Sequence, residues 1–370
     1  MNVLVTGSNG FIGKNLISRL KEEENLNIFE CDMDLDKGLL EEYCKEADFI
    51  YHLAGINRTD DDKDFMKSNY GFTLDLLEIL IKYNNRCPIM LSSSIQASNI
   101  SSYGKSKKAA EDLLLSYSKK NNSNVFIYRL PNIFGKWCKP NYNSVVATFC
   151  HNISRELPIT ITVPEKEITL VYIDDLVNQL IQLLYSTSTD RDNSFYEIQP
   201  TYSISLKKLS QLLYSFWEWG SNGYIPDLAD DFTKKLYSTY LSYIPEDKLS
   251  HKLIMHCDDR GSFTEFLKTH RNGQISVNLI KPGIIKGNHY HNTKVEKFLV
   301  VGGRGVIRLK NIFSDSVLEY LVDSEAMEVI DIPIGYSHNI ENTGNEDMIV
   351  VIWCNEVFDK ENPDTYMLNI

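Results

Sequence analysis

The chain has 370 residues, of which 43% are hydrophobic, 24% charged and 11% aromatic, a composition typical of folded globular proteins rather than disordered chains. It carries 38 Lys and Arg against 50 Asp and Glu, a net charge of −12, and so acidic a surface excludes nucleic acid and membrane as expected partners. The length predicts two domains. Seven cysteines without a CxxC pair, no signal peptide and no membrane-length apolar run favour a cytoplasmic protein with reduced thiols.

Short β-branched runs alternate with helical patterns in the N-terminal half of the chain. The predicted strands cover 2–6, 26–31, 48–54, 88–92 and 124–130, and the predicted helices cover 14–24, 72–82 and 105–119. Strand–helix alternation at this spacing predicts βαβ units and an α/β, Rossmann-like, doubly wound parallel sheet.

After the helical patterns end, the sequence changes to short strand-like runs. Short β-rich runs lie at 275–280, 298–301, 306–309, 328–332 and 348–353, with Gly, Pro and Asn turns between them. This pattern is typical of an all-β sandwich or barrel. We therefore expect a first domain at 1–246 and a second at 247–370.

A glycine-rich turn joins the first predicted strand to the first helix. Gly7, Gly10 and Gly13 have the spacing GxxGxxG, which suits a tight turn, a close approach to a pyrophosphate and helix packing. Asp32 ends the second strand, where a carboxylate can bind ribose hydroxyls. The spacing departs from GxGxxG, and a plain glycine-rich turn is the alternative interpretation. In its strand–turn–helix context the motif predicts dinucleotide binding.

A serine-ended strand is followed by Tyr103 and Lys107, which are four residues apart and share one helix face. An ammonium near a phenol favours the phenolate, so we expect Lys107 to lower the pKa of Tyr103 and make it an acid or base. Ser94, with Ser93 as a substitute, would hold a carbonyl oxygen where negative charge develops. The alternative for this pair is a solvated helix face.

Together with the segments 52–55, 129–135 and 172–176, these motifs resemble the extended short-chain dehydrogenases/reductases that modify nucleotide sugars. The resemblance implies catalysis at a sugar C4 carbonyl by Ser94, Tyr103 and Lys107. It also implies a set of cofactor-binding residues and a set of substrate-binding residues. The cofactor set is Gly7, Gly10, Phe11, Ile12, Gly13, Asp32, Leu53, Ala54, Asn69, Tyr103 and Lys107, and the substrate set is Ser94, Asn132, Lys136 and Lys139.

The two residues that follow Ser94 bear on which reaction of this family the chain would catalyse. The dehydratases of the family carry an acidic pair just after the serine or threonine, whereas this chain has Ile95 and Gln96 there. Elimination of water therefore lacks its proton donor. Reduction or epimerisation at C4 fits better.

The second predicted domain contains a group of metal-binding residue types. His289, His291 and Glu296 lie close in sequence, and His338 follows about forty residues later, a set that suits Zn²⁺ or a similar divalent ion. The two spacings resemble the two cupin motifs, with Met327 in place of one turn glycine. A single such histidine would more often be an ordinary core or surface residue. The combination predicts a metal-binding cupin barrel.

Over its whole length the chain resembles the CapF-type bifunctional enzymes of capsular polysaccharide synthesis, most specifically at 135–144. The resemblance implies a UDP-2-acetamido-2,6-dideoxy-hexos-4-ulose substrate, C3 epimerisation by the cupin domain and C4 reduction by the first domain. The product would be UDP-2-acetamido-2,6-dideoxy-L-talose, on the way to UDP-N-acetyl-L-fucosamine. Asp259, Tyr290 and Tyr336 are open candidates for the C3 base.

The sequence also bears on the cofactor and the oligomeric state, and it leaves two other classes of function open. The resemblance favours NADPH, but Asp32 would repel a ribose phosphate, so NADH stays open. Exposed barrel strands favour a homodimer through the cupin domain. The first other class is an NAD-dependent C4 epimerase or dehydrogenase with a structural cupin. The second is a non-catalytic cofactor-sensing module.

Overall fold

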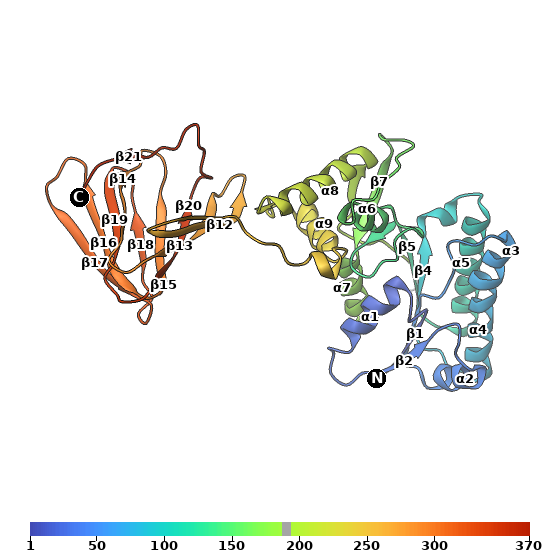
Figure 1. Cartoon of the computed structure of the whole chain (residues 1–370). Coiled ribbons are helices and arrows are strands. Elements are labelled where there is room, and N and C mark those ends of the chain that lie inside the picture. Colours follow the sequence, from blue (N-terminus) through green and yellow to red (C-terminus); the bar gives the residue numbers. More distant parts are fainter. Residues whose placement is uncertain (187–193) are drawn as a thin grey trace. The chain divides into compact units, whose positions relative to one another are not determined.

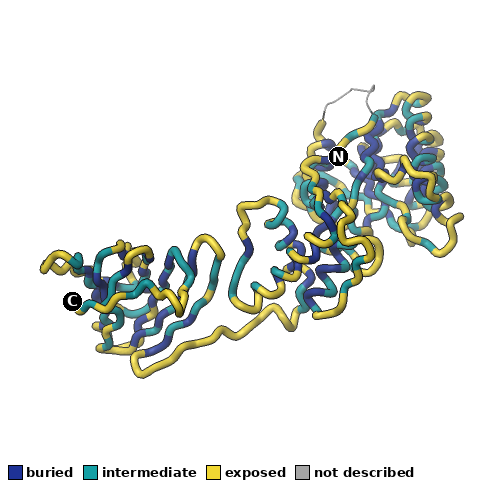
Figure 2. Tube along the Cα trace, turned by 90° about the horizontal axis from the view of Figure 1, so that it is seen from above, coloured by how far each residue is buried: buried dark blue, intermediate teal, exposed yellow. Residues whose placement is uncertain are grey.

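The computed structural model describes residues 1–186 and 194–370, and the chain divides into two compact units. The first unit comprises Met1–Leu213 and Ser238–Ile244, and the second comprises Tyr214–Tyr237 and Pro245–Ile370. Figure 2 shows that each unit has a buried interior of its own. The segment Tyr214–Tyr237 therefore lies with the C-terminal residues, whereas the sequence had grouped it with the N-terminal ones.

A six-stranded sheet forms the centre of the first unit, with parallel pairing throughout. The strand order is β2 (Asn27–Cys31), β1 (Asn2–Thr6), β3 (Phe49–His52), β4 (Ile89–Ser94), β5 (Val125–Leu130) and β8 (Phe195–Tyr196). The chain starts inside the sheet and builds outward in both directions, which confirms the predicted doubly wound arrangement. Its direction changes beside the end of β1, where such sheets bind ligands.

Helices cover both faces of this sheet (Figure 1). One face carries α1 (Phe11–Leu20) and α7 (Ile173–Leu184), and the other carries α2 (Lys37–Glu46), α4 (Phe72–Lys82) and α5 (Ser102–Asn121). The inner strands β1, β3 and β4 are buried on both sides, which explains their largely apolar sequences. The short helix α2 was not predicted, because its sequence is mostly polar.

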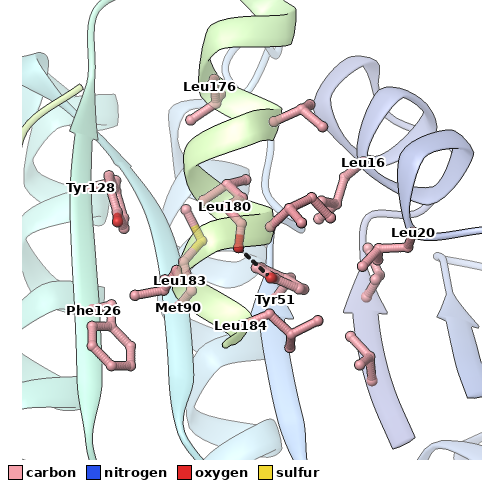
Figure 3. Close-up of a cluster of buried hydrophobic side chains, with 14 of the residues drawn as sticks. Leu16, Leu20, Tyr51, Met90, Phe126, Tyr128, Leu176, Leu180, Leu183 and Leu184 are labelled. Atoms are coloured by element: carbon pink, nitrogen blue, oxygen red, sulfur yellow. Dashed lines mark hydrogen bonds between the residues drawn. The ribbon is translucent and has the colours of Figure 1, made fainter. Parts of the chain in front are cut away.

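Figure 3 shows how α1 and α7 pack on the sheet. Leu16 of α1 and Leu180 of α7 are fully buried against Tyr51 and Met90, which lie on the central strands. The Tyr51 hydroxyl donates a hydrogen bond of 2.6 Å to the backbone carbonyl of Leu180. This bond satisfies the one polar atom that the tyrosine brings into the core.

The start of α5 is fixed by local chemistry. The hydroxyl of Ser101 accepts a hydrogen bond from the backbone N–H of Gly104, which caps the helix. The helix ends at Asn121, and the capping residue Asn122 has a φ of +57°, the left-handed conformation common just after helix ends. This cap places Tyr103 in the first turn and Lys107 one turn later, both near the end of β4.

Shorter elements complete the first unit and the segment up to residue 245. They are α3 (Asp62–Phe65), a π-helical turn (Met66–Gly71), a 3₁₀ turn (Ile95–Ser98), β6 (Asn132–Phe134), α6 (Val145–Ser154), β7 (Glu167–Tyr172), β9 (Tyr202–Ser205), α8 (Leu206–Ser221), β10 (Tyr224–Ile225) and α9 (Asp231–Leu241). Strands β6, β7 and β9 form a small separate sheet. Across 1–186 and 194–370, no helix is both long and apolar enough to cross a bilayer.

Two sheets make up the second unit, as its strand-rich sequence predicted. The larger runs β10, β12 (Gly261–Thr269), β13 (Gln274–Ile280), β20 (Met348–Cys354), β15 (Glu296–Gly302) and β18 (Val329–Ile332), with β11 (Met255–Asp258) paired to β12. The smaller runs β17 (Val317–Asp323), β16 (Arg304–Asn311), β19 (Tyr336–Asn342), β14 (Ile285–Tyr290) and β21 (Tyr366–Met367). Strands β17 and β19 were not among the predicted runs, and β19 is rich in polar residues.

Apolar side chains from both sheets meet in a single core. Phe298 and Val300 of β15 and Ile352 of β20 pack with Ile307 of β16 and Ile340 of β19. Inward positions alternate along each strand, so His338 shares the inward face of β19 with Ile340. The same alternation puts Glu296 on the face of Phe298 and Val300, at one end of the core.

Candidate active site and metal centre

The glycine-rich turn lies between β1 and α1, as predicted, and two of its glycines are required by close backbone contacts. Gly7 has a φ of +70°, and a Cβ there would lie 2.8 Å from the backbone nitrogen of Ala54. A Cβ on Gly13 would lie 2.2 Å from the carbonyl oxygen of Gly7. Both distances are too short for any side chain. Because these glycines carry no side chains, a ligand can approach the backbone closely at the N-terminus of α1.

A cavity of about 540 Å³ opens at this turn, at the carboxyl ends of the sheet strands. Eleven of the residues predicted for cofactor, substrate or catalysis line it. They are Gly7, Gly10, Phe11, Ile12, Gly13, Leu53, Ser94, Tyr103, Lys107, Asn132 and Lys139. Residues far apart in sequence thus share one site, because the strands that carry them are neighbours in the sheet.

The other predicted residues lie outside this lining. The Asp32 carboxylate accepts hydrogen bonds from the backbone N–H groups of Asn9, at 2.7 Å, and Met33, at 2.8 Å. Lys136 forms an ion pair of 2.5 Å with Asp174. Asp32 therefore tethers the glycine-rich turn to the end of β2, and the Lys136 ammonium already has a carboxylate partner.

Asn69 and Ala54 support the cavity wall from behind. The buried Asn69 side chain accepts from the backbone N–H of Ile56 at 2.9 Å and donates to the Ser106 hydroxyl at 2.9 Å. The backbone N–H of Ala54 donates to the Thr6 hydroxyl at 3.2 Å. These bonds fix the segment after β3 against β1 and α5.

Ser94, Tyr103 and Lys107 come together at the base of the cavity. Burial raises the pKa of Tyr103, and a hydrogen bond with Ser94 only partly offsets this effect. Burial also lowers the pKa of Lys107 to about 8, against the opposing effect of the Glu111 carboxylate. The Lys107 ammonium donates to the carbonyl of Ser92 at 3.0 Å. The phenol therefore keeps its proton at neutral pH, contrary to the expected lowering of its pKa by Lys107.

A buried ion pair beside these residues was not found by sequence reasoning. Glu111 is fully buried, and its carboxylate accepts from Arg129 at 2.6 and 2.9 Å and from the Ser93 hydroxyl at 2.6 Å. Ser93 is thereby engaged away from a carbonyl substrate, which leaves Ser94 as the serine next to Tyr103. The spacing of Glu111 four residues after Lys107 was the available signal.

His52 is a second buried residue whose role sequence reasoning missed. Its ring nitrogens are hydrogen-bonded to the hydroxyls of Thr6, at 2.8 Å, and Thr73, at 2.9 Å. Burial, helped by the nearby charge of Lys107, lowers the pKa of His52 to about 3. The imidazole is therefore neutral at physiological pH and joins β1, β3 and α4 rather than exchanging protons.

The second unit brings the four predicted metal ligands together. One donor atom from each of His289, His291, Glu296 and His338 lies within 4.8 Å of the others. The Nε2 atoms of His291 and His338 lie 3.4 and 3.2 Å from one carboxylate oxygen of Glu296. Pairing of β14 with β19 places His289 opposite His338, next to an irregularity at Gly287. Antiparallel register thus unites residues about fifty positions apart.

The electrostatics of this cluster suit a cation. Burial and the neighbouring His338 and His291 lower the pKa of His289 to about 4, so its ring is neutral. Burial alone would raise the pKa of Glu296, but the facing histidines lower it, so the carboxylate is ionised. His291 Nε2 and Glu296 Oε2 are buried without a hydrogen-bond partner. Three imidazoles and a carboxylate with such orphaned atoms fit Zn²⁺ or a similar divalent ion.

The expected C3 bases lie in different surroundings. Tyr336 shares the inward face of β19 with His338 and packs against the core of the unit. Tyr290 stacks on Tyr366, with ring centroids 5.2 Å apart. Asp259 is exposed in the turn between β11 and β12. Of the three, only Tyr336 is on the inward face of a strand that carries a cluster histidine.

Full-length similarity to known proteins decides the family. The chain is 41% identical over 370 residues to a UDP-2-acetamido-2,6-beta-L-arabino-hexul-4-ose reductase of Pseudomonas aeruginosa, covering 100% of this chain and 99% of that protein. It superposes on the crystal structure of the capsular polysaccharide assembling protein CapF of Staphylococcus aureus with a TM-score of 0.93 and 45% identity, covering 100% of both chains. The chain belongs to the CapF family.

Two family models match this CapF family chain, one over the part with the glycine-rich turn and the other over the part with the histidine cluster. The NAD dependent epimerase/dehydratase family matches residues 3–198, which include the glycine-rich turn and the cavity. The polysaccharide biosynthesis C-terminal domain matches residues 256–366, which include the histidine cluster. A UDP-glucose 4-epimerase of Thermotoga maritima, with a TM-score of 0.54 and 21% identity over 59% of this chain and 83% of its own, shares the fold alone.

Proposed function

We propose that this CapF family chain acts on a UDP-linked 4-keto amino sugar and that its first unit reduces the C4 carbonyl with a reduced nicotinamide cofactor. The name of the Pseudomonas aeruginosa relative and the match to the NAD dependent epimerase/dehydratase family support this reaction class. The observation that carries the proposal is the shared cavity of the glycine-rich turn with Ser94, Tyr103 and Lys107. Reduction of a ketone requires a hydride donor and a proton donor side by side, and this cavity offers places for both.

Each residue at the base of the cavity has a role in the reduction. The Ser94 hydroxyl donates a hydrogen bond to the C4 oxygen and polarises the carbonyl. Tyr103 transfers its phenolic proton to that oxygen, and its raised pKa keeps the proton available at neutral pH. The Lys107 ammonium favours the phenolate left behind. When bound, the cofactor supplies the hydride to C4, so the ketone becomes an alcohol.

The glycine-rich turn, with Phe11 and Ile12, is the proposed diphosphate site of the cofactor, and Leu53, Ala54 and Asn69 support the segment beside it. For the cofactor itself we propose NADPH, with NADH as the alternative that Asp32 favours. Asn132 and Lys139 line the cavity and are proposed substrate contacts. Lys136 would have to leave Asp174 to make such a contact.

The second proposed activity is inversion at C3 in the second unit. His289, His291, Glu296 and His338 would hold one divalent metal ion, for which we propose Zn²⁺. A bound ion supplies Lewis acidity for the enediolate of a 4-keto sugar. Among this chain's own residues, Tyr336 is the favoured acceptor of the C3 proton, and a proton from solvent delivered to the opposite face of C3 completes the inversion. The unit would thus prepare the stereoisomer that the first unit reduces to UDP-2-acetamido-2,6-dideoxy-L-talose.

One incubation tests both activities. The full chain is mixed with UDP-2-acetamido-2,6-dideoxy-hexos-4-ulose and NADPH in deuterated water, and the product is analysed by NMR. We expect one cofactor oxidised per sugar reduced, deuterium at C3 and inverted configuration at that carbon. Catalysis without net oxidation of added cofactor would instead support a C4 epimerase with retained NAD. Cofactor binding without any sugar turnover would support a sensing module.

We also propose a homodimer formed through the second unit. Strand β17 is an edge strand, and its Leu321 is 82% exposed, while the neighbouring Phe313 is 94% exposed. Unpaired strand edges with exposed apolar side chains favour association with a second copy. Light scattering should give twice the chain mass, and a monomer at micromolar concentration would refute the proposal.

A further inference from the structure

The end of the chain runs along the strand that carries His289. Strand β21 pairs antiparallel with β14, placing Met367 opposite His289 and Tyr366 opposite Tyr290. The backbone N–H of Leu368 donates to the carbonyl of Asn288 at 2.9 Å. The C-terminal segment thus covers an otherwise open edge of the smaller sheet, beside the histidine cluster.

Asp364, just before β21, binds the turn that connects His291 to Glu296. Its carboxylate accepts hydrogen bonds from three consecutive backbone N–H groups, those of Asn292, Thr293 and Lys294, at 3.1, 2.8 and 2.9 Å. The hydroxyl of Thr293 donates to the same carboxylate at 3.0 Å. One side chain therefore binds three of the four backbone N–H groups between two cluster residues, and the fourth, that of Val295, donates to the side chain of Asn355.

The backbone carbonyl of Asp364 contacts the cluster directly. It lies 2.5 Å from Nδ1 of His291, and a carbonyl can only accept, so Nδ1 must carry the proton. When the His291 ring is neutral, its lone pair therefore lies on Nε2, the nitrogen that faces Glu296. Asp364 has a φ of +40°, a left-handed backbone that lets its carboxylate and its carbonyl both contact the segment 291–294.

We propose that Asp364 is a positioning residue for the metal centre, which selects the Nδ1–H tautomer of His291 and holds the turn between His291 and Glu296 in the geometry that binds metal. This inference rests on the metal site proposed above. The metal itself does not contact Asp364 in this proposal. The residue acts through His291 and the turn, as partners that orient metal-bound histidines do elsewhere.

The test compares Asp364→Asn and Asp364→Ala with the wild-type full chain, using Zn²⁺ alone as the probe. Affinity is measured by competition with a chromogenic chelator, and we expect a loss of about 10–100-fold for the alanine variant. Asparagine keeps one acceptor oxygen but no charge, so its loss should be smaller. The visible spectrum of the Co²⁺-loaded variants should also change, because the spectrum reports ligand geometry.

Asp359→Asn is the matched control. Asp359 lies in the same C-terminal segment, and its carboxylate caps a turn by accepting from the backbone N–H of Glu361 at 2.9 Å, away from the cluster. It should leave Zn²⁺ affinity and the Co²⁺ spectrum unchanged. Thermal unfolding of each metal-free variant separates a general loss of stability from a loss of metal binding.

Two outcomes contradict the inference in distinguishable ways. If Asp364→Ala lowers the melting temperature of the metal-free chain but keeps wild-type Zn²⁺ affinity, Asp364 is only a structural residue. If the wild-type chain itself fails to bind Zn²⁺ in the competition assay, the metal site proposed above is wrong and the inference falls with it.

Discussion

Replacing Tyr103 by phenylalanine tests the proposed proton transfer with the least disturbance to the fold. The ring of Tyr103 packs edge-on against Phe65, with centroids 5.6 Å apart, and phenylalanine keeps this contact. Only the hydroxyl and its hydrogen bond with Ser94 are lost. Loss of a positioned general acid slows a reaction by about 10²–10⁴-fold, which corresponds to about 2.7–5.4 kcal/mol in the activation barrier.

The assay follows oxidation of NADPH with the 4-keto sugar at saturating concentrations. We expect kcat to fall by that factor while cofactor affinity stays near the wild-type value, because Tyr103 acts on the C4 oxygen. Tyr142→Phe is the matched control, since Tyr142 lines the same cavity and lies under the Lys139 ammonium rather than beside Ser94. Deuterium should still enter C3 in Tyr103→Phe, because that step belongs to the second unit.

The pH dependence gives a second measure of the same residue. The proton donor works only while the phenol is protonated, and a raised pKa moves the loss of that form to a pH above its ordinary value of about 10. Between about pH 6 and pH 9 any loss of rate should therefore come from Lys107, whose pKa is about 8, and not from deprotonation of Tyr103. Near-normal cofactor oxidation by Tyr103→Phe would falsify the role assigned to Tyr103.

Four further predictions concern the cofactor, the lysine, the metal and the core. NADPH should give the higher kcat/KM, and a tenfold preference for NADH, about 1.4 kcal/mol, would show that Asp32 decides the choice instead. Because the pKa of Lys107 is about 8, the plot of rate against pH should fall on its alkaline side. Glu111→Gln should move this fall to lower pH, because the Glu111 carboxylate raises the pKa of Lys107. A fall that stays at the same pH would contradict this coupling. His291→Ala should lose most of the bound metal, measured by elemental analysis, together with C3 exchange but not the reduction of a sugar already inverted at C3. Leu180→Ala should lower the free energy of unfolding of the first unit by about 2–5 kcal/mol in urea, since Leu180 is fully buried there. The metal content should stay unchanged. A loss of stability below that range would mean that neighbouring side chains move in to fill the space left by Leu180.

The sequence by itself determined the parts of each site that depend on local chain geometry. The turn from β1 to α1 requires glycine at position 13 because the carbonyl oxygen of Gly7 lies against it, and this requirement is visible as the spacing of Gly7 and Gly13. Tyr103 and Lys107 share a face because they are one helical turn apart. The strand-rich texture after residue 245 likewise indicated the second unit, although its polar strand β19 was missed.

Tertiary structure decided what depends on burial and on partners distant in the chain. Burial raises the pKa of Tyr103, whereas its local spacing to Lys107 suggested a lowering. Glu111 engages Ser93 and so distinguishes it from Ser94. Asp364 reaches His291 across 73 positions through the pairing of β21 with β14. Desolvation and long-range pairing are properties of the folded chain, and no spacing in the sequence encodes them directly.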